Sequence, residues 1–288
     1  MNLEQRIQFE NLGFLHLPGY IPPELVRRLG RAFDAAADRY RGDWREAVAG
    51  GSADPRFCDI PDILDVDDAF IDVVDIPKLV PLLLGAIGDD VQLNHTHARL
   101  FPPGKTFTAP WHSDMKHVLG IAHDHCPNFF VKVHYFFEDL EPDQGCLAFL
   151  PGTHRLPVGY PKPAISDPQN SSAVVKIVPK AGDCVMFNTH VLHMALDNKS
   201  LKTRKSLIYA YSHFWLKNYA NSVPRDLARV ATTPLRRQLF GIDKPGVNYF
   251  DQRYSEPTPV RDAFSTFATA GKRLLYTVYK NNSLTARR

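Results

Sequence analysis

The chain has 288 residues, of which 44% are hydrophobic and 23% charged, and its formal net charge is +3. These values are typical of a soluble globular protein, and the scattered basic residues argue against nucleic-acid binding. Four cysteines are widely spaced without a CxxC motif, which argues against a zinc ribbon and a disulfide-linked secreted domain. The sequence shows neither an apolar leader nor an apolar run of membrane-spanning length, which argues against secreted and membrane proteins. We therefore expect a cytoplasmic location.

Helical patterns dominate the first part of the chain. Apolar spacing and helix-terminating residues predict four helices, over residues 3–12, from 22 onward, over 67–74 and over 77–87. The first helix is expected to end at Gly13, and a short extended piece follows over residues 14–20. Residues 41–60 are rich in Gly, Asp and Arg, and we expect a mobile loop there.

Strand patterns separated by turn residues begin at residue 91. The predicted strands cover residues 91–101, 129–140, 146–150, 174–178, 183–187 and 206–215. In the second of these strands, Val131, Val133 and Tyr135 alternate with Lys132 and His134, as expected for two different faces of a sheet. Helices followed by many short strands predict an α+β chain with a mainly β core, a double-sheet jelly roll with flanking helices.

The region after residue 215 has weaker patterns. A helix is predicted over residues 224–240 and an amphipathic stretch over 260–279. No linker composition separates these segments from the strands that precede them. We therefore expect a single domain over residues 1–288, with a core at about 11–215 and a C-terminal extension over 216–288; monomer and homodimer both stay open.

The strongest chemical signal is a His-x-Asp pair, His112 and Asp114, followed 81 residues after His112 by His193. On an extended segment, residues i and i+2 point to the same side, so the pair can reach one ion. Two imidazoles and one carboxylate form the set that binds non-haem Fe(II) while leaving three coordination positions open. His190 competes for the third position, and we favour His193 because its spacing to Gly182-Asp183 and Arg204 suits that role.

The chain resembles the phytanoyl-CoA dioxygenase (PhyH-like) family of Fe(II)/2-oxoglutarate-dependent oxygenases. Ordered motifs carry the resemblance over roughly residues 11–215: 13–22, Phe101-Pro102-Pro103-Gly104, Trp111-His112-Ser113-Asp114, 145–155, and 182–193 with Asn198 and Arg204. Two positions depart from the family pattern, because Ser113 replaces a frequent glutamine and Met194-Ala195 replaces a frequent Gly-Ser pair. Those departures concern cosubstrate contacts rather than the metal ligands.

The resemblance implies a double-stranded β-helix, a cupin-like jelly roll, in which His112, Asp114 and His193 bind iron. It also implies that Arg204 binds the distal carboxylate of 2-oxoglutarate, a role that suits a planar, permanently charged guanidinium. His97 and His134 would lie beside the same cosubstrate, or each would be a core histidine. Related halogenases lack the carboxylate ligand, so Asp114 favours hydroxylation, or another oxidation such as desaturation or ring formation, with release of succinate and CO2.

The substrate is expected to be a small molecule, either a natural product or a small organic acid, oxidised with dioxygen at an unactivated C–H. Residues 115–127 are a candidate lid, and the candidate pocket residues are Arg99, Phe107, Trp111, Met115, Lys116, Lys132, Phe214 and Trp215. The main alternative is a cupin-like metal-binding protein or isomerase that does not use 2-oxoglutarate. A non-catalytic remnant of the fold and a zinc hydrolase are further alternatives.

Overall fold

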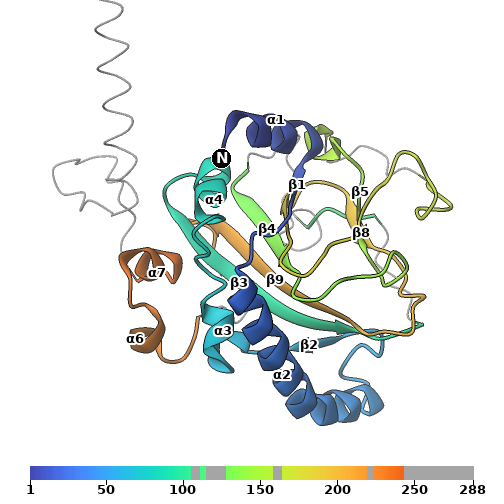
Figure 1. Cartoon of the computed structure of the whole chain (residues 1–288), viewed down its shortest axis with the longest axis horizontal. Coiled ribbons are helices and arrows are strands. Elements are labelled where there is room, and N and C mark those ends of the chain that lie inside the picture. The colour runs from blue at the N-terminus through green and yellow to red at the C-terminus, as the bar shows by residue number, and fades with distance from the viewer. Residues whose placement is uncertain (105–110, 115–127, 158–163, 219–222, 243–288) are drawn as a thin grey trace, which may run out of the picture.

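A computed structural model of the chain describes residues 1–104, 111–114, 128–157, 164–218 and 223–242 (Figure 1). Helix α1 (Leu3–Leu12) begins with a capping box, in which the Asn2 side chain accepts a hydrogen bond from the Gln5 backbone N–H and the Gln5 side chain accepts one from the Asn2 backbone N–H. Gly13 ends the helix in the left-handed region, with φ +86°. Strand β1 (Phe14–Leu17) follows, so the start of the chain agrees with the prediction.

Helix α2 (Pro23–Ala49) begins where the proline pair predicted but continues through half of the expected loop. The prediction of a loop over residues 41–60 is therefore wrong. Tyr40 and Trp44, four residues apart, pack against the main core, and the Trp44 indole donates a hydrogen bond to the Asp54 carbonyl at 3.2 Å. This partly buried stripe carries the helix past Gly42. Strand β2 (Cys58–Ile60) occupies the end of the same segment.

Short elements connect β2 to the main sheet. A 3₁₀ turn, η1 (Ile63–Asp65), precedes α3 (Asp68–Ile71) and α4 (Val80–Ile87). The last two fall inside the predicted helices over 67–74 and 77–87 but are shorter. The Asp67 side chain caps α3 by accepting a hydrogen bond from the Ala69 backbone at 2.7 Å.

Two antiparallel sheets form the β core. The larger has the strand order β1-β7-β4-β9-β3-β2 and the smaller the order β6-β5-β8. Their remaining strands are β3 (Val91–Phe101), β4 (Phe130–Tyr135), β5 (Leu147–Phe149), β6 (Val175–Ile177), β7 (Cys184–Asn188), β8 (His193–Ala195) and β9 (Arg204–His213). Every predicted strand is present, although most are shorter at one or both ends. Strands β2 and β8, of three residues each, were not predicted.

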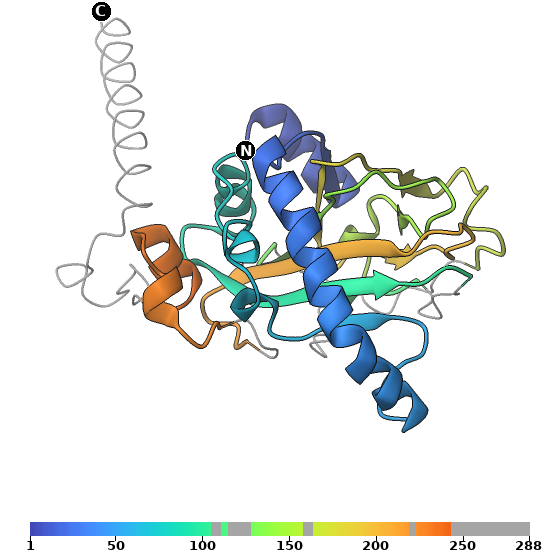
Figure 2. The same ribbon diagram turned by 60° about the horizontal axis from the view of Figure 1, so that its bottom comes forward.

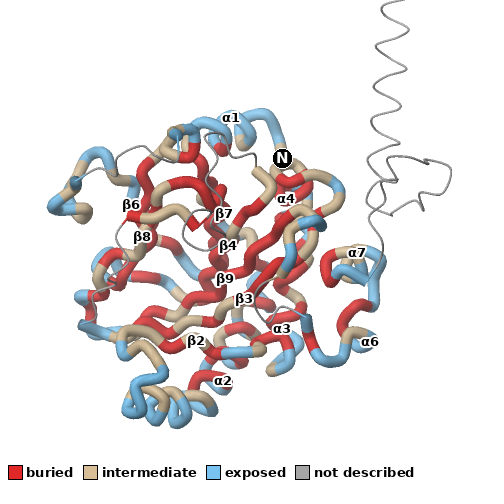
Figure 3. The backbone as a smooth tube through the Cα atoms, turned by 180° about the vertical axis from the view of Figure 1, so that it is seen from behind, coloured by how far each residue is buried: buried red, intermediate tan, exposed pale blue. Residues whose placement is uncertain are grey.

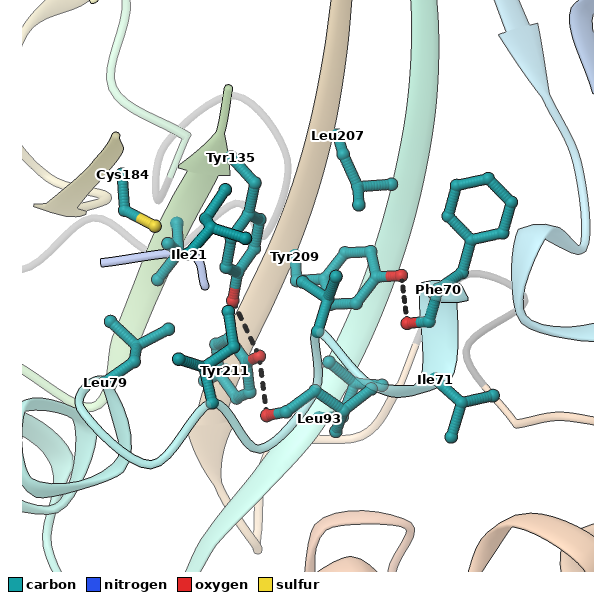
Figure 4. Close-up of a cluster of buried hydrophobic side chains, with 14 of the residues drawn as sticks. Ile21, Phe70, Ile71, Leu79, Leu93, Tyr135, Cys184, Leu207, Tyr209 and Tyr211 are labelled. Carbon is teal, nitrogen blue, oxygen red and sulfur yellow. Dashed lines mark hydrogen bonds between the residues drawn. The ribbon is translucent and has the colours of Figure 1, made fainter. Parts of the chain in front are cut away.

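The larger sheet uses its two faces differently. On one face, Val131, Val133 and Tyr135 of β4 belong to the same buried cluster as Leu29 and Phe33 of α2, and that helix lies across the sheet (Figure 2). Buried residues concentrate along the central strands (Figure 3). The Tyr211 hydroxyl donates to the Val74 carbonyl at 3.0 Å and pairs with the Tyr135 hydroxyl, which satisfies these polar groups inside the core (Figure 4).

The opposite face of the larger sheet looks toward the smaller sheet. A second cluster joins Phe14, Phe136 and Phe187 to Phe149 of β5, with the Phe14 and Phe149 rings stacked 4.4 Å apart. Lys132 and His134 lie on this inner face, between residues that pack on the helices. The alternation predicted for this strand is thus confirmed, and it places polar groups inside the jelly roll.

The last described segment forms two short helices, α6 (Leu227–Val230) and α7 (Pro234–Leu239), where one helix over residues 224–240 was predicted. The Thr233 side chain accepts a hydrogen bond from the Arg236 backbone at 3.1 Å and starts a new helix there. The predicted stretch over 260–279 lies outside the described residues. Within the described part of the chain, no helix is long and apolar enough to cross a membrane.

Candidate metal centre and cosubstrate cavity

A local backbone pairing brings the two candidate histidine ligands together. His112 and His193 form an isolated antiparallel bridge, in which each backbone N–H donates to the other residue's carbonyl, at 3.2 and 3.0 Å. Their rings lie 4.4 Å apart between centroids. The segment is not the continuous strand that the i, i+2 argument assumed, because Asp114 begins a helical turn and its backbone donates to the Thr189 carbonyl at 2.9 Å.

The three predicted ligands meet at one point. One nitrogen or oxygen atom from each of His112, Asp114 and His193 lies within 4.8 Å of the others. The Asp114 carboxylate oxygens stand 3.8 Å from His112 Nε2 and 3.5 Å from His193 Nε2. His193 Nδ1 lies 2.9 Å from the Val191 carbonyl, which only accepts, so this nitrogen carries the hydrogen and Nε2 is left with its lone pair.

His190, the alternative to His193, lies outside this group. Its Nδ1 is 3.5 Å from the Ser113 hydroxyl, and its backbone donates to the Asn188 side chain at 2.7 Å. Within the described residues, the trio that can hold an ion contains His193 and not His190. The geometry therefore favours the choice that the sequence spacing suggested.

Asp114 remains ionised despite its burial. Burial raises the pKa of this carboxyl, but the nearby charges of Lys132, His193 and His112 lower it by more, so its pKa lies well below the usual range. Lys132 is the nearest cation, with its Nζ 3.0 Å from Asp114 Oδ2. Burial lowers the pKa of His193, which keeps this imidazole neutral at neutral pH.

A cavity of about 310 Å³ opens beside the trio. Residues from β3, β4, β5, β8 and β9 line it together with the trio: His97, Arg99, Phe101, His112, Asp114, Lys132, His134, Leu147, His193, Ala195, Arg204, Ser206 and Ile208. All three candidate cosubstrate residues, Arg204, His134 and His97, therefore line the same cavity as the trio. A buried cavity lined by a few convergent polar groups is the usual form of a small-molecule site.

Arg204 is buried and has no carboxylate partner among the described residues. It is 4% exposed, its Nη1 donates to the Gly145 carbonyl, and its Nε has no hydrogen-bond partner in the described part of the chain. Burial lowers the pKa of Arg204 to about 10, so the guanidinium remains charged at neutral pH. A buried cation without an anion is costly, and a carboxylate from a ligand would relieve that cost.

The two additional histidines differ in their surroundings. His134 is buried, and its Nδ1 has no partner among the described residues. Burial, reinforced by Arg204 and Lys132, holds the pKa of His134 well below its usual value. His97 is partly exposed, with Nδ1 3.8 Å from Asp59 Oδ2.

The cavity also contains a pairing that the sequence did not indicate. Asp59 of β2 binds Arg99 of β3 through two hydrogen bonds, at 2.6 and 2.7 Å. No sequence signal marked Asp59, because it lies in the segment expected to be a loop. Among the candidate pocket aromatics, Trp111 packs in a small cluster with Leu150, and Phe214 and Trp215 are 41% and 54% exposed. None of these three lines the cavity.

The remaining pocket candidates, Phe107, Met115 and Lys116, and the candidate lid over residues 115–127, lie outside the described residues.

Comparison with known proteins identifies the family. The sequence profile of Phytanoyl-CoA dioxygenase (PhyH) matches residues 9–206, which is more than half of the chain. The chain belongs to the phytanoyl-CoA dioxygenase family. Peroxisomal phytanoyl-CoA dioxygenase of Homo sapiens is 24% identical over 231 residues, covering 72% of this chain and 67% of the human protein. Dioxygenase cdmD of Talaromyces verruculosus is 24% identical over 117 residues, covering 40% of this chain and 36% of that one.

Solved structures share the fold. HygX from Streptomyces hygroscopicus, with nickel, 2-oxoglutarate and hygromycin B bound, has a TM-score of 0.56 at 16% identity, covering 76% of this chain and 90% of that one. The non-heme alpha ketoglutarate dependent carbocyclase SnoK from nogalamycin biosynthesis has a TM-score of 0.54 at 15% identity, covering 74% and 84%. The predicted α+β jelly roll is confirmed.

Family membership establishes the class of chemistry. This phytanoyl-CoA dioxygenase family protein is a 2-oxoglutarate-dependent non-haem iron dioxygenase, and its cofactors are iron and 2-oxoglutarate. It acts on a small molecule with dioxygen. The cupin-like alternative without 2-oxoglutarate is therefore set aside, as are the zinc hydrolase and the non-catalytic remnant.

Proposed function

We propose that His112, Asp114 and His193 bind Fe(II), that Arg204 binds the distal carboxylate of 2-oxoglutarate, and that the enzyme hydroxylates an unactivated C–H of a small organic acid or natural product. Succinate and CO2 would be the coproducts. One observation carries the proposal: a His-Asp-His trio, in which Asp114 and His193 are buried, lines the same cavity as a buried guanidinium without a carboxylate partner among the described residues.

The residues present suit these two groups. Two imidazoles and a carboxylate are the ligand set that non-haem Fe(II) enzymes use, and the Nδ1 hydrogen bond of His193 directs its Nε2 to the centre. Arg204 Nε and His134 Nδ1 are buried polar atoms without partners among the described residues, each costing about 1–3 kcal/mol if left unsatisfied. A dicarboxylate in the cavity would satisfy such donors.

The metal and cosubstrate, when bound, would supply the oxidative chemistry, in which 2-oxoglutarate and dioxygen give succinate and CO2 and the second oxygen atom goes to the substrate. The chain's own residues position the reactants. Asp114 stays ionised, as a metal ligand requires, because nearby positive charge, chiefly that of Lys132, lowers its pKa by more than burial raises it. Arg204 is anchored on the Gly145 carbonyl, so its fork is already oriented before the cosubstrate enters.

His134 and His97 are proposed as further cosubstrate contacts, with different weight. His134 is neutral, buried and without a partner for Nδ1 in the described residues, so it can donate or accept a hydrogen bond at no cost to another interaction. His97 already lies near Asp59 and next to Arg99 on the same strand. We therefore assign His134 the closer role.

We also propose a cytoplasmic location, on the chemistry of the cysteines. Cys58, Cys146 and Cys184 are buried free thiols, and burial raises the pKa of Cys58 to about 11. Buried, unreactive thiols are usual in a reducing compartment.

Anaerobic titration tests the assignment of the site. Apoprotein receives Fe(II) and then 2-oxoglutarate while the visible metal-to-ligand charge-transfer band is recorded. We expect His193→Ala to lose the band and the matched variant His190→Ala to keep it. Arg204→Met should raise the half-saturating 2-oxoglutarate concentration by about 100-fold, because losing charge-assisted hydrogen bonds costs about 3 kcal/mol.

Surface variant Arg155→Met serves as the control for loss of an arginine, since Arg155 is exposed. Equal 2-oxoglutarate requirements in Arg204→Met and Arg155→Met would contradict the assignment of Arg204. A band that survives in His193→Ala and vanishes in His190→Ala would show that His190, and not His193, is the third metal ligand.

A further inference from the structure

Lys132 helps to keep Asp114 ionised, but the metal and cosubstrate roles assign no other function to its charge. It lies on the inner face of β4, lines the cavity, and its side chain is 11% exposed. Its ion-pair partner within the described residues is Asp114, at 3.0 Å. Asp114 is itself the proposed iron carboxylate, so its charge would be shared with the metal. Little negative charge is then left to offset the Lys132 ammonium.

The charges around the cavity do not balance. Four described lining residues carry a formal charge: Arg99, Asp114, Lys132 and Arg204. Asp59 neutralises Arg99 through a bidentate contact, and Asp114 offsets one of the other two cations, which leaves one positive charge. Bound Fe(II) and the 2-oxoglutarate dianion cancel each other. One unit of positive charge therefore remains in a buried site, where it is costly without an anion.

The register of the sheet places Lys132 far along the strand from Arg204, the proposed cosubstrate ligand. Lys132 pairs with Ala210 on β9, six residues beyond Arg204, which corresponds to about 20 Å along the strand. His134 pairs with Ile208, between the two. Along the strand, Arg204 therefore lies at one end of the cavity wall and Lys132 at the other, against Asp114.

We propose that Lys132 determines specificity by binding a single carboxylate of the substrate beside the metal centre. This inference rests on the proposed function and names the group by which the substrate is recognised. One ammonium with one uncompensated charge suits a carboxylate better than a phosphate monoester, which carries about −1.5 to −2 and three acceptor oxygens. The carboxylate would anchor the substrate so that a neighbouring C–H faces the metal.

Paired probes test the proposal on the full-length protein. The anaerobic Fe(II)/2-oxoglutarate complex is titrated with benzoate against benzamide, and with hexanoate against hexanamide, while the charge-transfer band and succinate formation in air are followed. In wild type, we expect the acid of at least one pair to perturb the band at a concentration at least tenfold lower than its amide.

Substitutions assign that preference to Lys132. Lys132→Met should weaken binding of the acid by about tenfold or more and leave the amide unchanged, and Lys132→Arg should recover most of the preference. Lys180→Met is the matched control, because Lys180 is an exposed lysine paired with Asp139 on the surface. Lys132→Gln replaces Lys132→Met should the latter fail to fold, and the comparison of acid with amide in wild type stands on its own.

Three results would overturn the inference. The first is that acids and amides bind wild type alike or that none perturbs the band, and the second is that Lys132→Met keeps the full acid preference. The third is that Lys132→Met raises only the 2-oxoglutarate requirement, which would assign Lys132 to the cosubstrate. Failure of wild type to form the band before any probe is added would instead count against the proposed function.

Discussion

Burial and neighbouring charges together decide the protonation of the side chains around the cavity. Burial raises the pKa of Asp114, yet the fields of Lys132, His193 and His112 reverse the shift. The same burial lowers the pKa of His97 to about 4, although Asp59 opposes the change. The site is therefore built from one carboxylate kept charged and several imidazoles kept neutral, which is the protonation state that metal binding requires.

His97 makes folding stability depend on pH. Its pKa is about 4 in the folded state and about 6.5 when unfolded, so below pH 6.5 the unfolded chain binds a proton that the folded chain refuses. The free energy of unfolding should fall as pH decreases from about 6.5 to 4, by up to about 3 kcal/mol from this residue. Urea unfolding of the metal-free protein at several pH values measures this slope.

The variant His97→Gln isolates the contribution. We expect its profile to be shallower than that of wild type between pH 6.5 and 4 and parallel to it above pH 7. Parallel profiles over the whole range would show that His97 does not titrate differently in the folded and unfolded states.

At the scale of elements, periodicity predicted the strands well and the shortest elements poorly. The alternation on β4 separated helix-facing from cavity-facing residues correctly, because a strand has only two faces. Helix α2 was predicted too short, since its continuation depends on Trp44 meeting the core. Strand β8 has three residues, too few for a pattern, and exists because it pairs with β5.

A tight turn before β5 supplies the carbonyl that holds Arg204 in place. Gly145 has φ +69°, and a Cβ there would lie 2.7 Å from the Phe101 ring, while its carbonyl accepts from Arg204. We expect Gly145→Ala to cost about 2–4 kcal/mol of stability and to weaken 2-oxoglutarate binding. Gly19→Ala, at φ +65° with open space around it, should cost about 1 kcal/mol without affecting the cosubstrate.

Chemical unfolding and the charge-transfer titration measure the two effects separately. Equal stability losses in both variants would mean that the Phe101 contact relaxes at no cost. A normal 2-oxoglutarate affinity in Gly145→Ala would remove the proposed role of its carbonyl in orienting Arg204.

At the scale of the whole molecule, the larger sheet lies between α2 on one side and the smaller sheet on the other (Figure 1, Figure 2). The family profile ends at residue 206, but packing continues beyond it. Arg236 of α7 forms ion pairs with Asp75 at 2.9 Å and Asp72 at 3.0 Å and is 17% exposed. These contacts favour the prediction that the chain after residue 215 is part of the same domain.

Removing the Arg236 side chain tests that prediction. Arg236→Met removes the cation paired with Asp75 and one of the two cations paired with Asp72, whose other partner, Arg28, stays at 2.8 Å. We expect a loss of about 2–3 kcal/mol in the free energy of unfolding, mostly from Asp75. The control Arg225→Met removes an arginine that is 82% exposed beside Asp62 and Asp65, so its cost should stay below about 0.5 kcal/mol. Two separate unfolding transitions in wild type, with Arg236→Met affecting one alone, would indicate a second domain.

The sequence by itself determined which functional residues this enzyme has. The His-x-Asp pair, the distant histidine, the arginine and the ordered motifs around them identified the class of chemistry, because ligand types and strand periodicity are local properties of a sequence. Tertiary structure alone decided the pairings of Lys132 with Asp114 and of Arg99 with Asp59, which join residues 18 and 40 positions apart. Strand register and packing create such contacts, and no short pattern in the sequence encodes them.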